Sequence, residues 1–293
     1  MRVLVIGRNG QVARTLARRA PEDFDLVLAG RETFDLTIPT AIPARLAEAA
    51  PDAVINAGAY TAVDKAESDV DIARAMNAEA PGALASLCAV RNIPLVHIST
   101  DYVFDGTKSA PYVETDPIAP INVYGAAKAE GEKAILATGA NAAILRTSWV
   151  YSYTGANFVR TMLRLAATKD ELGVIADQIG RPTWASDLAD ACFAATRALA
   201  AGQASAAGVF NYCGADDATW ADFAEAIFTE TPKHGLPSAR VRRISTAEYP
   251  TPAKRPANSR LDTTKIEKVL GLKPRPLDDA IARCLAEIAA QPA

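Results

Sequence analysis

The chain opens with a short apolar strand that runs straight into a glycine turn and a helix. Residues 2–7 are apolar and rich in β-branched side chains, and the segment Gly7-Arg-Asn-Gly10-Gln-Val-Ala13 follows them. Glycines at this spacing permit a tight turn and let a pyrophosphate approach the backbone N–H groups, while Ala13 keeps the helix close to the strand. The turn, including Asn9, therefore predicts dinucleotide binding; a plain strand-to-helix turn is the alternative.

Strands and helices go on alternating to about residue 150. Strands are expected at 2–7, 25–30, 52–58, 94–100 and 142–150, with helices at about 39–50, at 70–91 and around Tyr124. This order predicts right-handed βαβ units. The expected fold class is therefore α/β, a Rossmann-type doubly wound, mostly parallel sheet with ligands at the carboxyl ends of its strands.

The pattern changes after residue 150. Helices are expected at 155–168, 187–201, 219–228 and 276–290, a strand at 208–213, and loops at 177–183 and 250–256. We expect residues 1–150 to form a dinucleotide-binding domain to which 187–213 returns. Residues 151–186 and 214–293 are expected to form a smaller C-terminal substrate lobe.

A Tyr, a Lys and a strand-end hydroxyl form a reductase pattern in the first half. Tyr124 and Lys128 lie one above the other on a helix face, and the preceding strand ends in Ser99 and Thr100. The Tyr can give a proton to a carbonyl, the Lys charge can lower the Tyr pKa and hold a ribose, and the Thr can polarise the carbonyl. The alternative for the Tyr–Lys pair alone is a solvated helix turn.

The second and third strands carry the remaining cofactor candidates. Gly30 and Arg31 stand where dinucleotide folds often place an acidic residue for the ribose 2′-hydroxyl. Arg31 can pair with a 2′-phosphate, so we expect NADPH to be preferred and NADH also to be used; a solvated surface Arg is the alternative. The candidates on this side are Arg31, Asp35, Leu36, Ala57, Gly58, Ala59 and Thr61.

Composition argues against several functions. The chain has 293 residues, 49% of them hydrophobic, and a formal net charge of −3, so neither nucleic acid nor a membrane surface is an expected partner. No apolar run reaches the roughly 20 residues that span a bilayer, and the N-terminus has no signal-peptide layout. The scattered cysteines are expected to be buried thiols, and the protein to be cytoplasmic. His97 lies within a strand and is expected to be structural.

Together these residues resemble the extended short-chain dehydrogenases/reductases, and within them the dTDP-4-dehydrorhamnose reductases. The resemblance is most specific in Ser99-Thr-Asp-Tyr-Val-Phe104 and Leu145-Arg-Thr-Ser-Trp-Val-Tyr151. It also includes Asn157-Phe158 and Arg255-Pro-Ala-Asn-Ser-Arg-Leu261, and so spans nearly the whole chain. It implies NAD(P)H-dependent reduction of the C4 ketone of dTDP-4-dehydro-L-rhamnose to dTDP-L-rhamnose, with this nucleotide sugar as the small-molecule partner.

The resemblance also implies a role for individual residues. Tyr124 would protonate the C4 oxygen, Lys128 would hold the nicotinamide ribose, and Thr100 would tune the proton transfer. Residues implied to hold the cofactor are Gly10, Gln11 and Val12 at the pyrophosphate, Asp35 and Leu36 at the adenosine, and Ala59 and Thr61 at further groups. Residues implied on the substrate side are Thr100, Asp101, Trp149, Asn157 and Arg255.

Two departures from the family and two alternatives remain. Thr15 and Ser186 stand where some members have glutamates that hold magnesium at a dimer interface, so we expect no metal and a monomer or weak homodimer. One alternative is an NAD-dependent nucleotide-sugar epimerase of the same fold, which would keep NAD tightly bound. The other is a non-catalytic NADP-binding regulatory subunit, against which the intact Thr100, Tyr124 and Lys128 argue.

Overall fold

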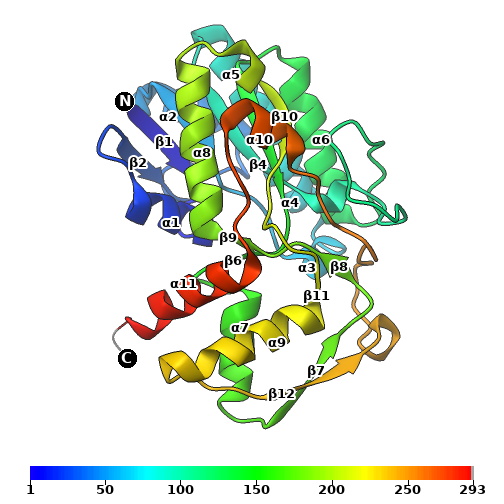
Figure 1. The fold of residues 1–293 in the computed structure, drawn as a ribbon. Helices are drawn as coiled ribbons and strands as arrows, with labels where there is room; N and C mark the ends of the chain where they lie inside the picture. Colours follow the sequence, from blue (N-terminus) through cyan, green and yellow to red (C-terminus); the bar gives the residue numbers. More distant parts are fainter. Residues whose placement is uncertain (292–293) are drawn as a thin grey trace.

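The computed structural model describes residues 1–291 and contains a six-stranded sheet with helices on both faces (Figure 1). The strand order is β10-β5-β4-β3-β1-β2, and every neighbouring pair is parallel. The expected Rossmann-type fold class is confirmed. The strands are β1 (Arg2–Ile6), β2 (Asp25–Ala29), β3 (Ala53–Asn56), β4 (Leu95–Thr100), β5 (Ala142–Thr147) and β10 (Gly208–Asn211).

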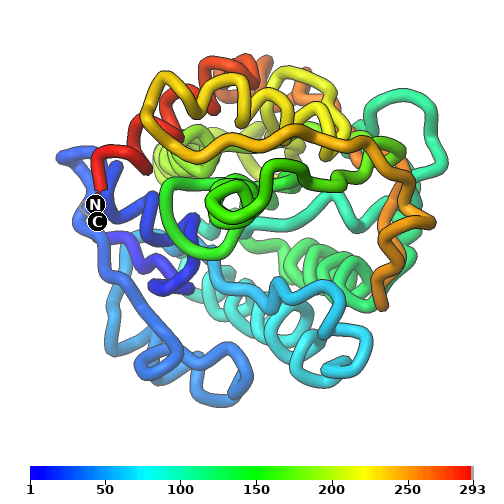
Figure 2. The backbone as a smooth tube through the Cα atoms, turned by 90° about the horizontal axis from the view of Figure 1, so that it is seen from below, coloured from blue at the N-terminus to red at the C-terminus, as the bar shows by residue number. Residues whose placement is uncertain are grey.

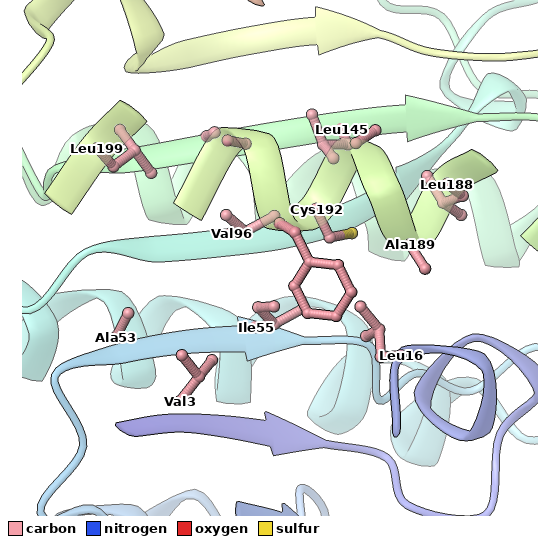
Figure 3. Close-up of a cluster of buried hydrophobic side chains, with 14 of the residues drawn as sticks. Val3, Leu16, Ala53, Ile55, Val96, Leu145, Leu188, Ala189, Cys192 and Leu199 are labelled. Atoms are coloured by element: carbon pink, nitrogen blue, oxygen red, sulfur yellow. The ribbon is translucent and has the colours of Figure 1, made fainter. Parts of the chain in front are cut away.

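One face of the sheet is covered by α1 (Gln11–Arg19) and α8 (Ala185–Ala200). Figure 3 shows Cys192 of α8 over Val96 and Ile55 of the sheet, with Leu188 farther along the helix, and these side chains belong to one buried apolar cluster. Helix α10 (Thr264–Leu270) adds Ile266 to the same cluster. The segment around α10, which the sequence division assigns to the second lobe, therefore packs on the first, because its apolar side chains meet β10 and α8.

The opposite face carries α2 (Ile42–Ala49), α5 (Ala80–Arg91) and α6 (Val123–Ala137). The single helix expected at 70–91 is instead α4 (Val70–Arg74), a π-helical turn η2 (Ala75–Glu79) and α5. Within η2 the fully buried Asn77 turns inward. Its amide nitrogen donates to the Tyr60 carbonyl at 2.9 Å, and its oxygen accepts from the Tyr60 N–H at 2.9 Å. Asn77 thereby fixes the chain that follows β3.

Two glycines allow α6 to lie directly against neighbouring backbone. A Cβ at Gly125 would overlap the carbonyl of Tyr102, and a Cβ at Gly131 would overlap the carbonyl of Asn77. The start of α6 is fixed by the N-cap Asn122, whose side chain accepts from the Gly125 N–H at 2.8 Å. Any shift of α6 along or away from the sheet would lose these contacts. They therefore fix the positions of the α6 side chains that face the sheet.

The second lobe has its own apolar cluster, built from α7 (Phe158–Ala166), α9 (Trp220–Glu230) and α11 (Leu277–Ala289). These helices pack with a parallel pair, β7 (Glu171–Ile175) and β12 (Arg240–Ile244), which the sequence analysis does not predict. Figure 2 looks at the molecule from below, with α7 seen nearly end-on between the first 90 residues and the segments after residue 200.

Short elements complete the fold. No helix within residues 1–291 has both the length and the apolar character to cross a membrane. The remaining strands are β6 (Val150–Tyr151), β8 (Ile179–Gly180), β9 (Thr183–Trp184) and β11 (Ala218–Thr219). The remaining helical segments are α3 (Val63–Ala66), η1 (Pro39–Ala41), η3 (Asp101–Val103), η4 (Ala204–Ala206), η5 (Thr231–His234) and η6 (Thr246–Glu248).

We predict that Gly131→Ala destabilises the protein. Alanine has the higher helix propensity by about 1 kcal/mol, but its methyl group would overlap the backbone of η2, and overpacking costs about 1–3 kcal/mol beyond that gain. Urea unfolding measures the difference. Lys133→Ala, on the exposed side of the same helix, is the matched control and should change stability by less than about 0.5 kcal/mol. A Gly131→Ala protein as stable as the parent would disprove the close contact.

Candidate active site

A cleft of about 590 Å³ opens beyond the carboxyl ends of the parallel strands. It lies at the end of β1, which has β2 as its neighbour on one side and β3 on the other, so that the strand order reverses there. Parallel sheets of this kind bind ligands at such a point. Every residue expected to contact the cofactor lines it, together with three of the residues expected on the substrate side. The lining includes Gly7, Asn9, Gly10, Gln11, Val12, Arg31, Asp35, Leu36, Ala57, Gly58, Ala59, Thr61, Thr100, Asp101, Tyr124, Lys128 and Trp149.

The glycine turn leaves bare backbone facing the cleft. Gly7 has a φ of +102°, and a Cβ there would lie 2.8 Å from the Cα of Gly58, so only glycine fits. Helix α1 begins at Gln11 with Gly10 as its N-cap, and no side chain caps it. The first N–H groups of α1 therefore remain available to an anion, which is the arrangement that a dinucleotide pyrophosphate requires.

Charged pairs border the far end of the cleft. Arg31 is 77% exposed, and its Nε lies 3.3 Å from the Asp35 carboxylate, which also accepts from Thr37. Although Gly30 and Arg31 stand where an acidic residue is common, a carboxylate does lie at the end of β2. Glu32 folds back over Gly30, where its oxygen would lie 2.7 Å from an added Cβ, and pairs with Arg8 at 2.5 Å. The absent side chain of Gly30 leaves the space that Glu32 uses.

Tyr124 lies beside Thr100 at the centre of the cleft. Burial raises the pKa of Tyr124 to about 12, the Thr100 hydroxyl lowers it and the charge of Asp101 raises it further. The expectation that the Lys128 charge lowers this pKa stays a prediction, because burial is the largest cause of the shift. Tyr124 is protonated across the whole neutral range.

The amine of Lys128 is engaged below the cleft. Lys128 is 1% exposed; its Nζ donates to the Ile98 carbonyl at 2.6 Å and lies 3.2 Å from Nε2 of His97. Burial lowers the pKa of Lys128 to about 8, although the charge of Glu132 on the next turn of α6 opposes this shift. A small change in these surroundings can therefore change the charge of Lys128 near neutral pH.

Asp101 presents an unpaired carboxyl oxygen. The side chain is 3% exposed, and its Oδ1 accepts from the Thr100 hydroxyl at 2.9 Å. Its Oδ2 has no hydrogen-bond partner among residues 1–291. Burial raises the pKa of Asp101 to about 7. Asp101 thus brings a buried carboxyl oxygen without a partner to the lining of the cleft.

Trp149 forms an aromatic wall of the cleft and has a strained backbone. Its φ is +49°, a left-handed conformation that is uncommon for a bulky residue, and its ring stacks on Trp220 at 3.6 Å between centroids. Gly180 lies against the indole, since a Cβ there would be 2.5 Å from Trp149 Cε2. The backbone strain and the stack together hold the ring at the cleft.

Asn157 and Arg255 do not line the cleft. Asn157 is the N-cap of α7: its oxygen accepts from the Arg160 N–H, and its amide nitrogen donates to the Ser152 and Thr154 carbonyls. Arg255 pairs with Asp64 at 2.9 Å. Both side chains are committed to contacts within the protein, so the structure gives no support to the substrate contacts expected of them.

Comparison with known proteins agrees with this architecture. A family model described as the RmlD substrate binding domain matches residues 1–290. The chain is 47% identical over 274 residues to the dTDP-4-dehydrorhamnose reductase of Sinorhizobium fredii, a match that covers 93% of each chain. The chain belongs to the dTDP-4-dehydrorhamnose reductase family. The resemblance seen in its motifs is confirmed.

Solved structures of this family have the same fold over their full length. The crystal structure of a dTDP-4-dehydrorhamnose reductase from Clostridium acetobutylicum has a TM-score of 0.90 at 34% identity and covers 97% of this chain and 98% of that one. The Bacillus anthracis dTDP-4-dehydrorhamnose reductase, solved in complex with NADP, also has a TM-score of 0.90, at 32% identity, and covers 98% of this chain and 99% of that one.

Sequence reasoning missed several residues of this family member's cleft. Met76 reaches it from the π-helical turn, and Gly155 and Ala156 from the start of the second lobe. No local pattern identified Met76, because its direction depends on the π-helical turn.

We predict that Asp101→Asn stabilises the protein at pH 8 but not at pH 4. The carboxyl ionises near 3.8 when unfolded and near 7 when folded, so the parent loses stability as pH rises between these values. The variant should recover up to about 4 kcal/mol of unfolding free energy at pH 8. Thermal and urea unfolding at both pH values measure this.

A matched variant should behave in the opposite way. Hydrogen bonds from Thr107 and Tyr112 lower the pKa of Asp105, so Asp105→Asn should reduce stability at pH 8. Equal effects of Asp101→Asn at pH 4 and pH 8 would show that its carboxyl is not desolvated.

Proposed function

We propose that this chain catalyses the NAD(P)H-dependent reduction of the C4 ketone of dTDP-4-dehydro-L-rhamnose to dTDP-L-rhamnose. One observation carries the proposal: a single cleft unites the anion-binding start of α1 with Tyr124, Thr100 and Asp101. Membership of the dTDP-4-dehydrorhamnose reductase family supplies the substrate class.

Each residue of the cleft has a proposed role. The N–H groups around Gly10 bind the pyrophosphate of the cofactor, whose reduced nicotinamide supplies the hydride for C4 when bound. Tyr124 gives its hydroxyl proton to the C4 oxygen, and Thr100 orients that hydroxyl. Trp149 forms a wall against the sugar, and the free oxygen of Asp101 binds a sugar hydroxyl. Lys128 holds the nicotinamide ribose of the cofactor next to Tyr124.

We propose that NADPH is the preferred cofactor and that NADH is also used. The structure of the Bacillus anthracis relative in complex with NADP supports NADPH, and so does Arg31 at the cleft. The Arg8–Glu32 pair beside it limits the preference for NADPH, because the Glu32 carboxylate repels the 2′-phosphate of the adenosine ribose. NADH use remains compatible with this balance of charges.

The proposed enzyme works in the cytoplasm without magnesium, as a monomer or weak homodimer. The positions that hold glutamates in some relatives carry only hydroxyl groups here. The Thr15 hydroxyl donates to the Gln11 carbonyl at 2.8 Å within α1, and Ser186 is buried in α8. Neither supplies a carboxylate for a metal ion.

The decisive experiment measures NADPH consumption with dTDP-4-dehydro-L-rhamnose, in the parent and in Tyr124→Phe. The variant keeps the ring but loses the acid, so turnover should fall about 10²–10⁴-fold while NADPH affinity changes little. Tyr102→Phe is the matched control, because its ring packs against Tyr124 at 5.8 Å and lies outside the cleft lining; it should retain parental turnover.

The same assay separates the alternatives. An epimerase would be purified with tightly bound NAD and would not consume NADPH. A regulatory subunit would bind NADP and leave every dTDP- and UDP-4-keto sugar unreduced. Turnover of Tyr124→Phe within about threefold of the parent would remove Tyr124 as the acid.

We predict that Arg31→Ala weakens NADPH binding by about 1–3 kcal/mol, the range of a charge-assisted hydrogen bond, and leaves NADH binding almost unchanged. Dissociation constants of both cofactors, measured by calorimetry, test this. Arg45→Ala is the control, because this exposed arginine pairs with Glu48 on α2 and does not line the cleft. If Arg31→Ala weakens the binding of NADPH and NADH equally, Arg31 does not determine the preference for NADPH.

A further inference from the structure

His97 and Asn56 lie in a buried row beneath the catalytic lysine. His97 is 1% exposed in the middle of β4, and Asn56 is 1% exposed at the end of β3. Nδ1 of His97 lies 3.1 Å from the Asn56 amide nitrogen, and its Nε2 lies 3.2 Å from Nζ of Lys128. The histidine expected to be structural is thus in direct contact with a residue of the proposed active site.

The orientation of the Asn56 amide determines where the His97 proton lies. The Gly58 N–H donates to the Asn56 oxygen at 3.2 Å, so the amide nitrogen, which carries only hydrogens, faces Nδ1 of His97. Nδ1 must therefore accept. Burial holds the pKa of His97 well below its usual range, so the ring is neutral and its one proton lies on Nε2.

The Nε2–H group of His97 points at the amine of Lys128. Nζ already donates to the Ile98 carbonyl at 2.6 Å. An uncharged amine has a lone pair that can accept from Nε2–H, whereas an ammonium has only hydrogens to offer. The arrangement therefore favours the uncharged form of Lys128.

We propose that Asn56 and His97 act as a positioning pair that directs the Nζ lone pair of Lys128 and makes its charge adjustable near neutral pH. This deepens the proposed reductase function and rests on it. In the proposed reaction the charged lysine supports Tyr124 and the cofactor ribose, and the pair sets the pH at which that charge is lost.

The other charged groups around Lys128 are neutralised or directed elsewhere, so the contact between His97 Nε2–H and Lys128 Nζ has the main effect on the charge of Lys128. Glu132, on the next turn of α6, attracts the ammonium, but its carboxylate is held in three contacts by the Arg146 guanidinium from β5. Tyr124, one turn earlier on α6, is neutral. Asp101 of η3 faces Tyr124 and Thr100. Beneath Nζ, the His97 N–H is the group that discriminates between amine and ammonium.

Nitrogen-15 NMR of the parent protein labelled in histidine tests the proposal directly, because the chain has two histidines and His234→Gln assigns the signals. We expect His97 to carry its proton on Nε2 between pH 6 and 9. The Nε2 shift should move with a midpoint near pH 8, following Lys128, and the movement should vanish in Lys128→Met. A proton on Nδ1, a doubly protonated ring or a shift independent of pH would overturn the proposal.

A kinetic measurement separates positioning from simple stability. His97→Leu removes the N–H, so the alkaline limb of the kcat–pH profile should move up by about one pH unit. His97→Gln, which can place an N–H near the Nε2 position, should move it less. A limb unchanged in His97→Leu would overturn the proposal. The NMR result requires no turnover, so failure of the proposed reductase function would be recognised separately.

Discussion

A buried ion pair beneath the cleft holds the elements that make it. Glu132 of α6 accepts from Nε and Nη2 of Arg146 on β5, at 3.0 and 2.6 Å, and from the Ser99 hydroxyl of β4 at 2.5 Å. Both charged side chains are at most 2% exposed. Removing one partner of such a pair costs about 3–5 kcal/mol, because the other is left buried and unpaired. Glu132 lies on the same helix face as Tyr124 and Lys128, so the pair fixes the direction in which both point.

The cleft depends equally on places where side chains are absent. Gly7 and Gly58 let the loops after β1 and β3 touch, and Gly125 and Gly131 let α6 press against backbone carbonyls. Opposite them, Trp149 keeps an unfavourable φ because its ring is stacked on Trp220 and held by the second lobe. The first lobe thus supplies a cofactor surface of bare backbone, and the second lobe braces the aromatic wall that faces it.

Features that depend on a few consecutive residues could be predicted from the sequence. Contacts between residues far apart in the sequence could not. The glycine turn and the strand-end Thr100 are local patterns, and both lie in the cleft as expected. Arg255 has a charge suited to a pyrophosphate, yet it pairs with Asp64, 191 positions away in the sequence. Strands β7 and β12 were missed because three of the five residues of β12 are arginines, and because the pairing joins distant segments.

The raised pKa of Tyr124 keeps the acid form that the proposed reduction uses in place at neutral pH. With a pKa of about 12, only about one Tyr124 in 10⁵ is ionised at pH 7, so the proton that the reduced sugar needs is always in place. A new alkoxide is more basic than this phenolate, and the transfer is therefore downhill. Oxidation of the alcohol would require the rare phenolate as its base. With the Lys128 amine bound to the Ile98 carbonyl below the cleft, Tyr124 at neutral pH keeps the protonated form that reduction of the ketone uses.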